Sequence, residues 1–345
     1  MTIYEKRHFM VFLFQLTPHA NIRYREAQMK LGQAELCCLL KRLGLSCEIT
    51  PYTMGGVSFL RFEADALTDE QLSALSMHSA ALMIAEQQGE FLRPLEKVSH
   101  DYLSADLAEV LKYKGKTSAV FTHMMINCAL AASDFFDSKE PLTVLDPMCG
   151  RGTTCFVALQ HGMNAIGVDI DNRDLKECAD YFERYLQYHR MKHKLDQSSR
   201  TVRKHAVPAA IYTIADTKEH FKDGDTRTLS LFLGDTGLTG ELCKKSPAHL
   251  LVADLPYGVQ HAPQDGKRTE SFLQVMTRAL PQWKDAIRKG GAIALSFTTL
   301  TLKKADLVQL LSDAGFTPLT EAPYDDFEHF VEQAVNRDFV VARKD

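Results

Sequence analysis

Carboxylates follow four apolar segments of the sequence, each at the point where the segment ends: Asp146, Asp169, Asp235 and Asp254. In an open parallel sheet the carboxyl ends of the strands meet at one edge, and ligands bind there. A single acid after a strand most often caps the next helix, but repetition at successive segments favours a shared ligand site. Carboxylates accept hydrogen bonds from hydroxyl and amino groups and attract cations. The pattern therefore predicts a site for a polar, positively charged ligand.

The segment that begins at Asp146 reads DPMCGRGTT and places Gly150 and Gly152 in a turn before a helix. Glycines at such a turn let the backbone approach a ligand closely. The third glycine of the dinucleotide fingerprint GxGxxG is missing, and so is the GK[ST] of a phosphate-binding P-loop. A carboxylate at the turn would also repel a pyrophosphate. The turn suits a cationic ligand better, such as a sulfonium that carries an ammonium group.

The next two acids are placed to accept hydrogen bonds from a nucleoside. Asp169 lies about 20 residues after the glycine turn, the spacing at which an acid accepts ribose hydroxyls. Asp171 is either a helper of Asp169 or the N-cap of the helix that follows. Asp235 lies next to the end of the segment LSLFLGDT, which runs from Leu229 to Thr236, and is a candidate acceptor for an adenine amino group.

The fourth acid begins a short loop that reads DLPYG. The Asp254 carboxylate and the Leu255 carbonyl can both accept hydrogens of an exocyclic amine, which would direct its lone pair toward an electrophile. The carboxylate would also stabilise positive charge that develops on the nitrogen. Pro256 stiffens the loop, and Tyr257 offers a face on which a base can stack. An ordinary β-turn without a catalytic role is the alternative reading of this loop.

Taken together, LDPMCGRGTTCFVAL, GVDID, LGDT and ADLPYG resemble the class I S-adenosylmethionine-dependent methyltransferases. DPxCGxGT with DxPYG is similar to the THUMP-associated group that makes N2-methylguanosine in tRNA. The resemblance covers 141–345 and, more weakly, 1–95, where no separate THUMP domain is recognised. The family more often has D-P-P-Y at the loop, and N-L-P-Y occurs in rRNA dimethyladenosine enzymes. The resemblance implies S-adenosylmethionine as cofactor, catalytic Asp254, Leu255, Pro256 and Tyr257, and cofactor contacts from Asp146, Pro147, Cys149, Gly150, Gly152, Thr153, Asp169, Ile170, Asp235 and Thr236.

The elements that must position these residues are predicted as an α/β fold. Its main part is a doubly wound, Rossmann-like sheet, mostly parallel, with the last segment, 336–344, as an antiparallel edge strand. We expect three regions: a small α+β, ferredoxin-like module at 1–95, a helical connector at 96–140, and the methyltransferase domain at 141–345 with a polar insertion near 190–228. Predicted strands and helices of the first region are 8–16, 24–43, 58–64 and 69–89. Those of the rest are 104–113, 117–133, 142–146, 152–162, 164–169, 173–189, 230–234, 249–254, 270–288, 290–297 and 303–314.

The overall composition limits how the protein could meet a nucleic acid. The net charge is −4, so RNA contacts must come from a local basic patch. The best candidate lies within 190–204, although a solvated charged face is an equally good reading. A second basic stretch precedes the methyltransferase domain and includes Thr117, and Arg337 is a candidate to reach the active face. The predicted RNA-binding residues are Lys114, Lys116, Arg190, Lys192, Lys194, Arg200, Arg203 and Lys204.

Other classes of site are disfavoured. His189 and His193 are spaced as metal ligands on a helix, but the Glu of HExxH is missing and we expect no metal. Eight cysteines without a CxxC pair, and no signal peptide, predict reduced thiols in a cytoplasmic protein. No apolar run is long enough to predict a membrane span.

The predicted function is methylation of an exocyclic base amine, guanosine N2 in tRNA or another structured RNA. The alternatives are the same chemistry on DNA or rRNA adenine, on a protein amide or on a small molecule, and a non-catalytic RNA-binding scaffold. The presence of Asp254, Pro256 and Tyr257 argues against the scaffold. Oligomeric state and any partner protein are left open by the sequence.

Overall fold

The computed structural model describes residues 9–18, 23–45, 47–110, 116–243, 247–256, 271–332 and 335–345. The chain divides into two compact units, Met1–His100 with His329–Val331, and Asp101–Glu328 with Glu332–Asp345. A short strand, β14 (His329–Glu332), straddles this division in the sequence.

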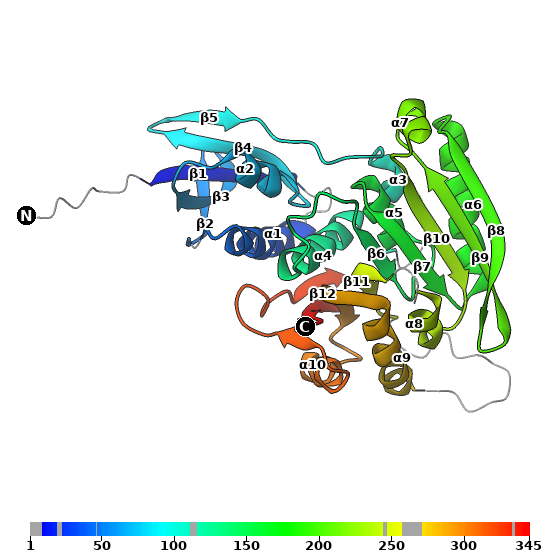
Figure 1. The fold of residues 1–345 in the computed structure, drawn as a ribbon. Coiled ribbons are helices and arrows are strands. Elements are labelled where there is room, and N and C mark those ends of the chain that lie inside the picture. Colours follow the sequence, from blue (N-terminus) through cyan, green and yellow to red (C-terminus); the bar gives the residue numbers. More distant parts are fainter. Residues whose placement is uncertain are drawn as a thin grey trace, which may run out of the picture. The chain divides into compact units, whose positions relative to one another are not determined.

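The first unit is a five-stranded antiparallel sheet with two helices (Figure 1). The connectivity of β1 through β4, with the strand order β2-β3-β1-β4, is that of a ferredoxin-like split βαβ motif, and β5 pairs antiparallel with β4. The central strand β1 buries Phe12 and Phe14, and Phe12 stacks on Phe62 of β3. The elements are β1 Met10–Leu16, α1 Arg23–Arg42, β2 Thr50–Met54, β3 Val57–Ala64, α2 Asp69–Ser76, β4 Ala81–Gln88 and β5 Phe91–Leu95.

The prediction of one helix over 69–89 is wrong. The helix ends at Ser76, and the segment from Ala81 is the strand β4, which pairs with β1. The break is fixed by polar groups that a straight helix would leave buried without partners. The fully buried Glu35 accepts hydrogen bonds from the backbone and hydroxyl of Ser79, and His78 contacts the Gly32 carbonyl at 2.9 Å. Strands β2 and β5 were also not expected from the sequence.

The second unit carries the large sheet, whose order is β13-β15-β12-β11-β6-β7-β10-β9-β8. Neighbours from β10 to β12 run parallel, whereas β15 is antiparallel to both β12 and β13. The elements are α3 Asp106–Glu109, α4 Ala119–Ala132, β6 Thr143–Asp146, α5 Thr153–Gln160, β7 Asn164–Asp169, α6 Asn172–Tyr188, β8 His193–Val202, β9 His205–Ile214, α7 Lys218–Asp223, β10 Arg227–Leu233, η1 Thr236–Leu238, α8 Thr239–Leu242, β11 Ala248–Asp254, α9 Phe272–Ala286, β12 Ile287–Thr298, α10 Lys304–Asp313, β13 Thr317–Leu319 and β15 Val335–Arg343.

The chain starts this sheet at its centre. From β6 it passes to β7, continues to the edge hairpin β8–β9, and comes back to β10 beside β7. It then crosses to β11 on the other side of β6, so the winding reverses between β6 and β11. Ligands of doubly wound sheets bind at such a switch point, outside the carboxyl ends of the strands. The predicted fold class is therefore confirmed. The predicted edge strand at 336–344 is antiparallel as expected but lies inside the sheet, because β13 pairs with its outer side.

Helices cover both faces of the parallel strands (Figure 1). On one face α9 and α10 bury Trp283 and Leu307 in a large apolar core that includes Leu251 of β11. On the other face α4, α5 and α6 pack, with Phe156 of α5 stacked on Phe182 of α6. Burial from both sides explains why these strands are nearly continuous apolar runs in the sequence.

The polar insertion near 190–228 forms the hairpin β8–β9 and extends the sheet beyond β10. The sequence predicts a segment poor in core residues, but β9 buries Val207, Ala209, Tyr212 and Ile214. The sequence hid this strand because β8, at the edge of the sheet, is mostly exposed and polar.

Candidate functional site

The glycine turn between β6 and α5 forms a cradle at the switch point. Gly150 and Gly152 have φ angles of +49° and +86°, which side chains other than hydrogen rarely allow. A Cβ at Gly152 would lie 2.5 Å from the Cys178 sulfur, so this glycine is required by packing as well. A Cβ at Gly150 would meet no atom within 4 Å and would instead fill open space above the turn. The turn thus leaves room for a ligand against bare backbone.

Asp146 lies at the base of this cradle, at the carboxyl end of β6. Its side chain is buried and accepts a hydrogen bond of 3.0 Å from the Met148 N–H. Burial raises the pKa of this carboxyl from 3.8 to about 7, and the negative charges of Asp169 and Asp254 add to the shift. Ionised Asp146 would therefore be buried near two other carboxyl groups. A cationic ligand would relieve the repulsion among them.

Asp169 ends the neighbouring strand, β7, and faces the glycine turn. Its Oδ2 accepts the Gly150 N–H at 2.7 Å, and its Oδ1 accepts the Asp171 N–H at 2.8 Å. Burial raises the pKa of this carboxyl. Each carboxylate oxygen can accept about two hydrogen bonds, so both oxygens keep an acceptor position for a pair of adjacent hydroxyls. The next side chain, Ile170, is 63% exposed and offers an apolar surface beside them.

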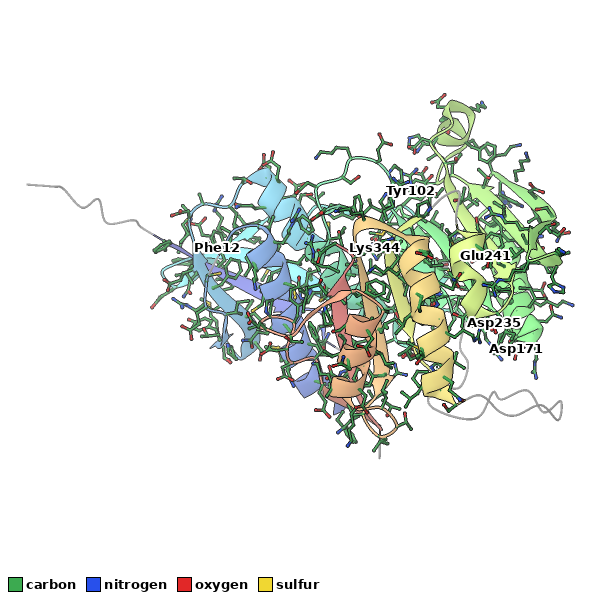
Figure 2. All side chains as sticks on the ribbon, turned by 60° about the horizontal axis from the view of Figure 1, so that its bottom comes forward. Phe12, Tyr102, Asp171, Asp235, Glu241 and Lys344 are labelled. Carbon is green, nitrogen blue, oxygen red and sulfur yellow. The ribbon has the colours of Figure 1, made fainter. Side chains whose placement is uncertain are left out.

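Asp171 and Asp235, both labelled in Figure 2, are engaged by the protein itself. Asp171 caps α6 by accepting the Arg173 N–H at 2.8 Å, which is the capping role considered for it. Asp235 accepts the Gly237 N–H at 2.6 Å and both terminal nitrogens of Arg278. Burial alone would raise the Asp235 pKa, but the Arg278 and Gly237 hydrogen bonds outweigh it and the pKa is lowered.

Thr236 is buried and accepts the Trp283 indole N–H at 2.9 Å. Its side chain therefore serves the contact between η1 and α9. Contact of Asp235 and Thr236 with an adenine stays a prediction, and it would have to share Asp235 with Arg278.

The Asp254 carboxylate, at the carboxyl end of β11, is held by two hydroxyl donors and one ion pair. Its Oδ1 accepts the Ser296 hydroxyl at 2.7 Å, and its Oδ2 accepts the Thr117 hydroxyl. The Arg337 guanidinium lies 3.3 Å from Oδ2 and also donates to the Thr117 oxygen at 3.4 Å. Arg337 is buried, while about a fifth of the Asp254 side chain is exposed. These contacts fix the carboxylate, and the part of its surface that they do not cover remains exposed.

These partners come from three separate parts of the unit. Ser296 lies opposite Asp254 in the register of β11 and β12, and Arg337 lies on β15, the next strand. Thr117 precedes α4. The Leu255 N–H bonds the Ser296 carbonyl at 2.8 Å, which fixes the start of the loop.

Leu255 is buried and Pro256 is exposed. The predicted stacking residue Tyr257 lies outside the described residues, as does Lys114. The other predicted cofactor residues at the glycine turn are Pro147, Cys149 and Thr153, and the Cys149 N–H bonds the Val168 carbonyl at 3.1 Å. Their contact with a cofactor stays a prediction.

Sequence reasoning missed Ser296 and gave Thr117 and Arg337 only loose roles. Ser296 did carry a signal, because it is a lone hydroxyl within the apolar run AIALSF of a buried strand. Buried polar groups of this kind nearly always have a partner.

The six basic residues of 190–204 do not form one patch, contrary to expectation. The strand β8 separates them, and its 10 residues span about 33 Å. Arg190, Lys192 and Lys194 lie at its start, and the others lie at its end. Of the second basic stretch, Lys116 donates to the Ala108 and Glu109 carbonyls, which ties its ammonium group to α3.

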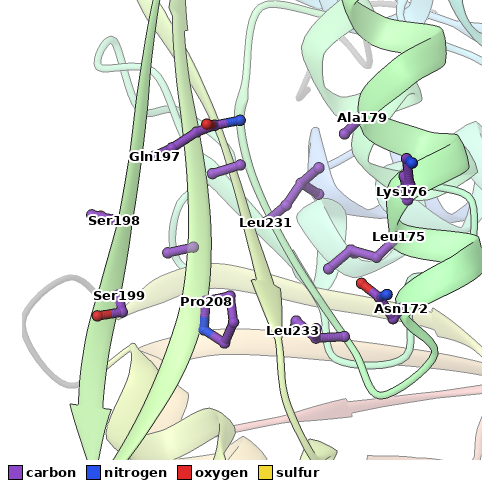
Figure 3. Close-up of a pocket in the computed structure, with 12 residues that line it drawn as sticks. Asn172, Leu175, Lys176, Ala179, Gln197, Ser198, Ser199, Pro208, Leu231 and Leu233 are labelled. Atoms are coloured by element: carbon purple, nitrogen blue, oxygen red, sulfur yellow. The ribbon is translucent and has the colours of Figure 1, made fainter.

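A groove with a volume of about 590 Å³ runs between α6 and the strands β8, β9 and β10 (Figure 3). Leu175, Leu231 and Leu233 form its apolar part, and Gln197 projects toward α6 (Figure 3). Asn172, next to the capping Asp171, also lines it. None of the four strand-end acids lines this groove, so it is a separate feature from the cradle.

Within the described ranges, no three His, Cys, Asp or Glu side chains are grouped so that they could hold a metal ion. His189 pairs with Asp106 at 2.9 Å, and His193 begins β8, so the two histidines do not share a helix face. Among the helices of the described part of the chain, none has the length and apolar character needed to cross a bilayer.

No protein-family model matches this sequence, and no curated protein matches it at a significant level. Among solved structures, TrmN from Thermus thermophilus is 14% identical, with a TM-score of 0.39 over 86% of this chain and 60% of that one. The rRNA methyltransferase aviRa from Streptomyces viridochromogenes is 14% identical, with a TM-score of 0.41 over 70% and 91% of the two chains. The magnesium protoporphyrin IX methyltransferase ChlM from Synechocystis PCC 6803, solved with bound SAM, is 14% identical, with a TM-score of 0.38 over 67% and 87%.

This chain therefore spans about 60% of the length of TrmN. Similarities of this size assign neither a substrate nor an activity to it.

Proposed function

We propose that the second unit is an S-adenosylmethionine-dependent methyltransferase that acts on an exocyclic amine of an RNA base, with guanosine N2 in tRNA as the expected acceptor. The observation that carries this proposal is the Asp254 carboxylate, fixed by Thr117, Ser296 and Arg337 at the edge that also holds the glycine cradle. The motif resemblance to class I methyltransferases supports this proposal, and so does the geometry of Asp254 and the cradle.

The residues of the cradle fit this cofactor. Asp169 keeps two acceptor positions for the ribose hydroxyls, and Ile170 offers its exposed side chain to the adenine ring. Gly150 leaves space against the backbone, and Asp146 supplies a carboxylate for the ammonium and sulfonium charges. When bound, S-adenosylmethionine supplies an activated methyl group on a sulfonium, so the protein must mainly align an acceptor nitrogen.

Asp254 would perform this alignment. A carboxylate has about four acceptor positions; the Ser296 hydroxyl occupies one on Oδ1, while the Thr117 hydroxyl and the Arg337 ion pair engage Oδ2. The remaining position, on Oδ1, would accept one hydrogen of the substrate amine, and the Leu255 carbonyl would accept the other. Two acceptors on one side turn the nitrogen lone pair to the opposite side. The carboxylate would also stabilise the positive charge on nitrogen and hold the surplus proton at Oδ1.

An RNA base must leave its stack to reach this position, as in other enzymes that modify bases. Asp254 could accept the N–H hydrogens of a base amine or of a protein amide. Enzymes that methylate a protein amide usually have N-P-P-Y at this loop, and this chain has Asp254 in place of that Asn, which favours a base amine. The D-L-P-Y sequence does not choose between guanine and adenine, so the test must distinguish methylation of these two bases.

The direct test is mass spectrometry of nucleosides from tRNA treated with purified protein and S-adenosylmethionine. We expect N2-methylguanosine to form with wild-type protein. Asp254→Ala should reduce the rate at least 100-fold, with cofactor affinity unchanged by calorimetry, whereas Asp313→Ala, an exposed acid on α10, should leave the rate unchanged. Formation of methylated adenosine instead would show that adenine, and not guanine, is the acceptor base. Equal rates for both variants would refute the role of Asp254.

A further inference from the structure

The hairpin β8–β9 extends past the carboxyl edge of the sheet. The last register pair between β9 and β10 joins Ala209 to Phe232, and β10 ends one residue later at Leu233. Because β9 begins at His205, about three of its residues run beyond β10, a distance of roughly 10 Å. The tip of the hairpin therefore projects on the same edge of the sheet as Asp169 and Asp254.

The tip consists of Arg203, Lys204 and His205, and all three are exposed. We name these three residues the hairpin tip. Arg203 forms an ion pair of 2.6 Å with Glu241 of α8, which holds its guanidinium close to the tip. Lys204 adds a second positive charge at the point of the turn. An exposed cationic projection of this kind is a usual contact for the phosphate backbone of a nucleic acid.

The tip is held firmly in place. Beside it, Val202 and Val207 are buried in the core formed with α9, and the Arg200 guanidinium lies 4.6 Å from the centre of the Phe232 ring. Arg200 also donates to the Leu242 carbonyl of α8. It is thus an anchor of the hairpin, and its charge is turned inward. Because the tip is already ordered in the free protein, ligand binding costs little further loss of conformational entropy there.

The turn itself uses an unfavourable sequence. Arg203 and Lys204 have φ angles of +47° and +68°, the conformation that two-residue hairpin turns of type I′ require at both positions. Asn-Gly is the favoured pair for that turn, and two long side chains there store strain. The chain keeps two basic residues where Asn-Gly would be more stable.

We propose that the hairpin tip contacts the phosphate backbone of the RNA whose base is methylated at Asp254. This inference rests on the proposed function. Five strand spacings separate β8 from β11, so the tip lies roughly 20–25 Å along the edge from the catalytic loop. It therefore contacts nucleotides other than the target and adds to binding, not to the chemical step. Arg190, Lys192 and Lys194, at the other end of β8, take no part.

The test is a pair of double variants. Arg203→Asn with Lys204→Gly removes both charges and gives the turn its favoured sequence, so folding is preserved. Lys218→Ser with Lys222→Ser removes two exposed charges from α7, where no RNA contact is predicted, as the matched control. Binding of unmodified tRNA is titrated between 50 and 200 mM salt, and kcat and KM are measured with the same RNA.

We expect the tip variant to bind RNA at least tenfold more weakly, to lower the slope of log affinity against log salt by about 1–2, and to raise KM with kcat unchanged. The control should behave as wild type. Equal salt-dependent binding by both variants, or a loss in kcat alone, would overturn the role of the tip. If the wild-type protein does not bind RNA, both the proposed RNA substrate and the proposed role of the hairpin tip are wrong.

Discussion

The buried carboxyl of Asp146 gives the sharpest prediction, because its ionisation should control cofactor affinity near neutral pH. Its pKa is raised from 3.8 to about 7, with burial as the main cause. A cationic ligand binds the ionised form. With a pKa of about 7, the ionised fraction is about 0.9 at pH 8 and about 0.1 at pH 6. The affinity of wild-type protein should therefore fall about tenfold between these pH values, or about 1.4 kcal/mol.

The same shift has a consequence for stability without cofactor. The folded state binds a proton at Asp146 between pH 4 and pH 7, whereas the unfolded chain does not. The stabilisation from this group is therefore complete below about pH 4 and is lost as the pH rises through about 7. Asp146→Asn keeps an oxygen for the Met148 N–H and removes the titration. Its stability relative to wild type should rise between pH 5 and pH 8.

The assay is calorimetric titration with S-adenosylmethionine at pH 6, 7 and 8 for wild type and Asp146→Asn. Groups on the ligand titrate equally in both experiments, so the ratio of the two affinities isolates Asp146. We expect the ratio to change about tenfold across the range, and thermal unfolding to show the opposite trend without ligand. A ratio that is constant from pH 6 to pH 8 would refute the reasoning that links this carboxyl to the cationic ligand.

Three further predictions concern the cradle and the carboxylate cluster. Asp169→Asn should weaken cofactor binding at least tenfold, about 1.4 kcal/mol, by calorimetry, because it replaces one ribose acceptor with a donor; unchanged affinity would remove Asp169 from the site. Gly152→Ala should destabilise the protein by about 1–3 kcal/mol in denaturant unfolding, and Cys178→Ala in the same chain should recover part of the loss; no recovery would show that the 2.5 Å contact does not matter. Ser296→Ala and Arg337→Met should lower kcat with cofactor affinity unchanged. The activation free energy should rise by about 0.5–1.5 kcal/mol for Ser296→Ala and by about 1.5–3 kcal/mol for Arg337→Met, because only Arg337→Met removes a charged group. A fall in cofactor affinity instead would show that these residues support the cradle and not Asp254.

The sequence predicted the parallel part of the sheet well, for a physical reason. Strands β6, β7 and β11 are buried on both faces, so each is a nearly continuous apolar run, and each run is followed by an acid. The position of these acids at the carboxyl edge of the sheet then follows from the fold class alone. Asp146, Asp169 and Asp254 could be singled out without a structure, because ligands of open parallel sheets bind at the carboxyl ends of the strands.

Elements that depend on distant partners could not be predicted in this way. Strand β4 has an apolar pattern that fits a helix as well, and the break before it is stabilised by contacts with a distant helix, such as those of Ser79 with Glu35. The edge strand β8 is too polar to be recognised alone. The Thr117 hydroxyl meets Asp254 across 137 residues of sequence, and no local pattern signals that contact.

The most direct test of the account is a crystal structure of the protein with S-adenosylhomocysteine. We predict that the ribose hydroxyls lie within 2.7–3.2 Å of the Asp169 carboxylate, that the chain of the ligand runs over Gly150, and that its sulfur faces the free side of Asp254. A ligand bound elsewhere, for instance in the groove between α6 and β8, with the carboxyl ends of β6 and β7 untouched, would contradict it.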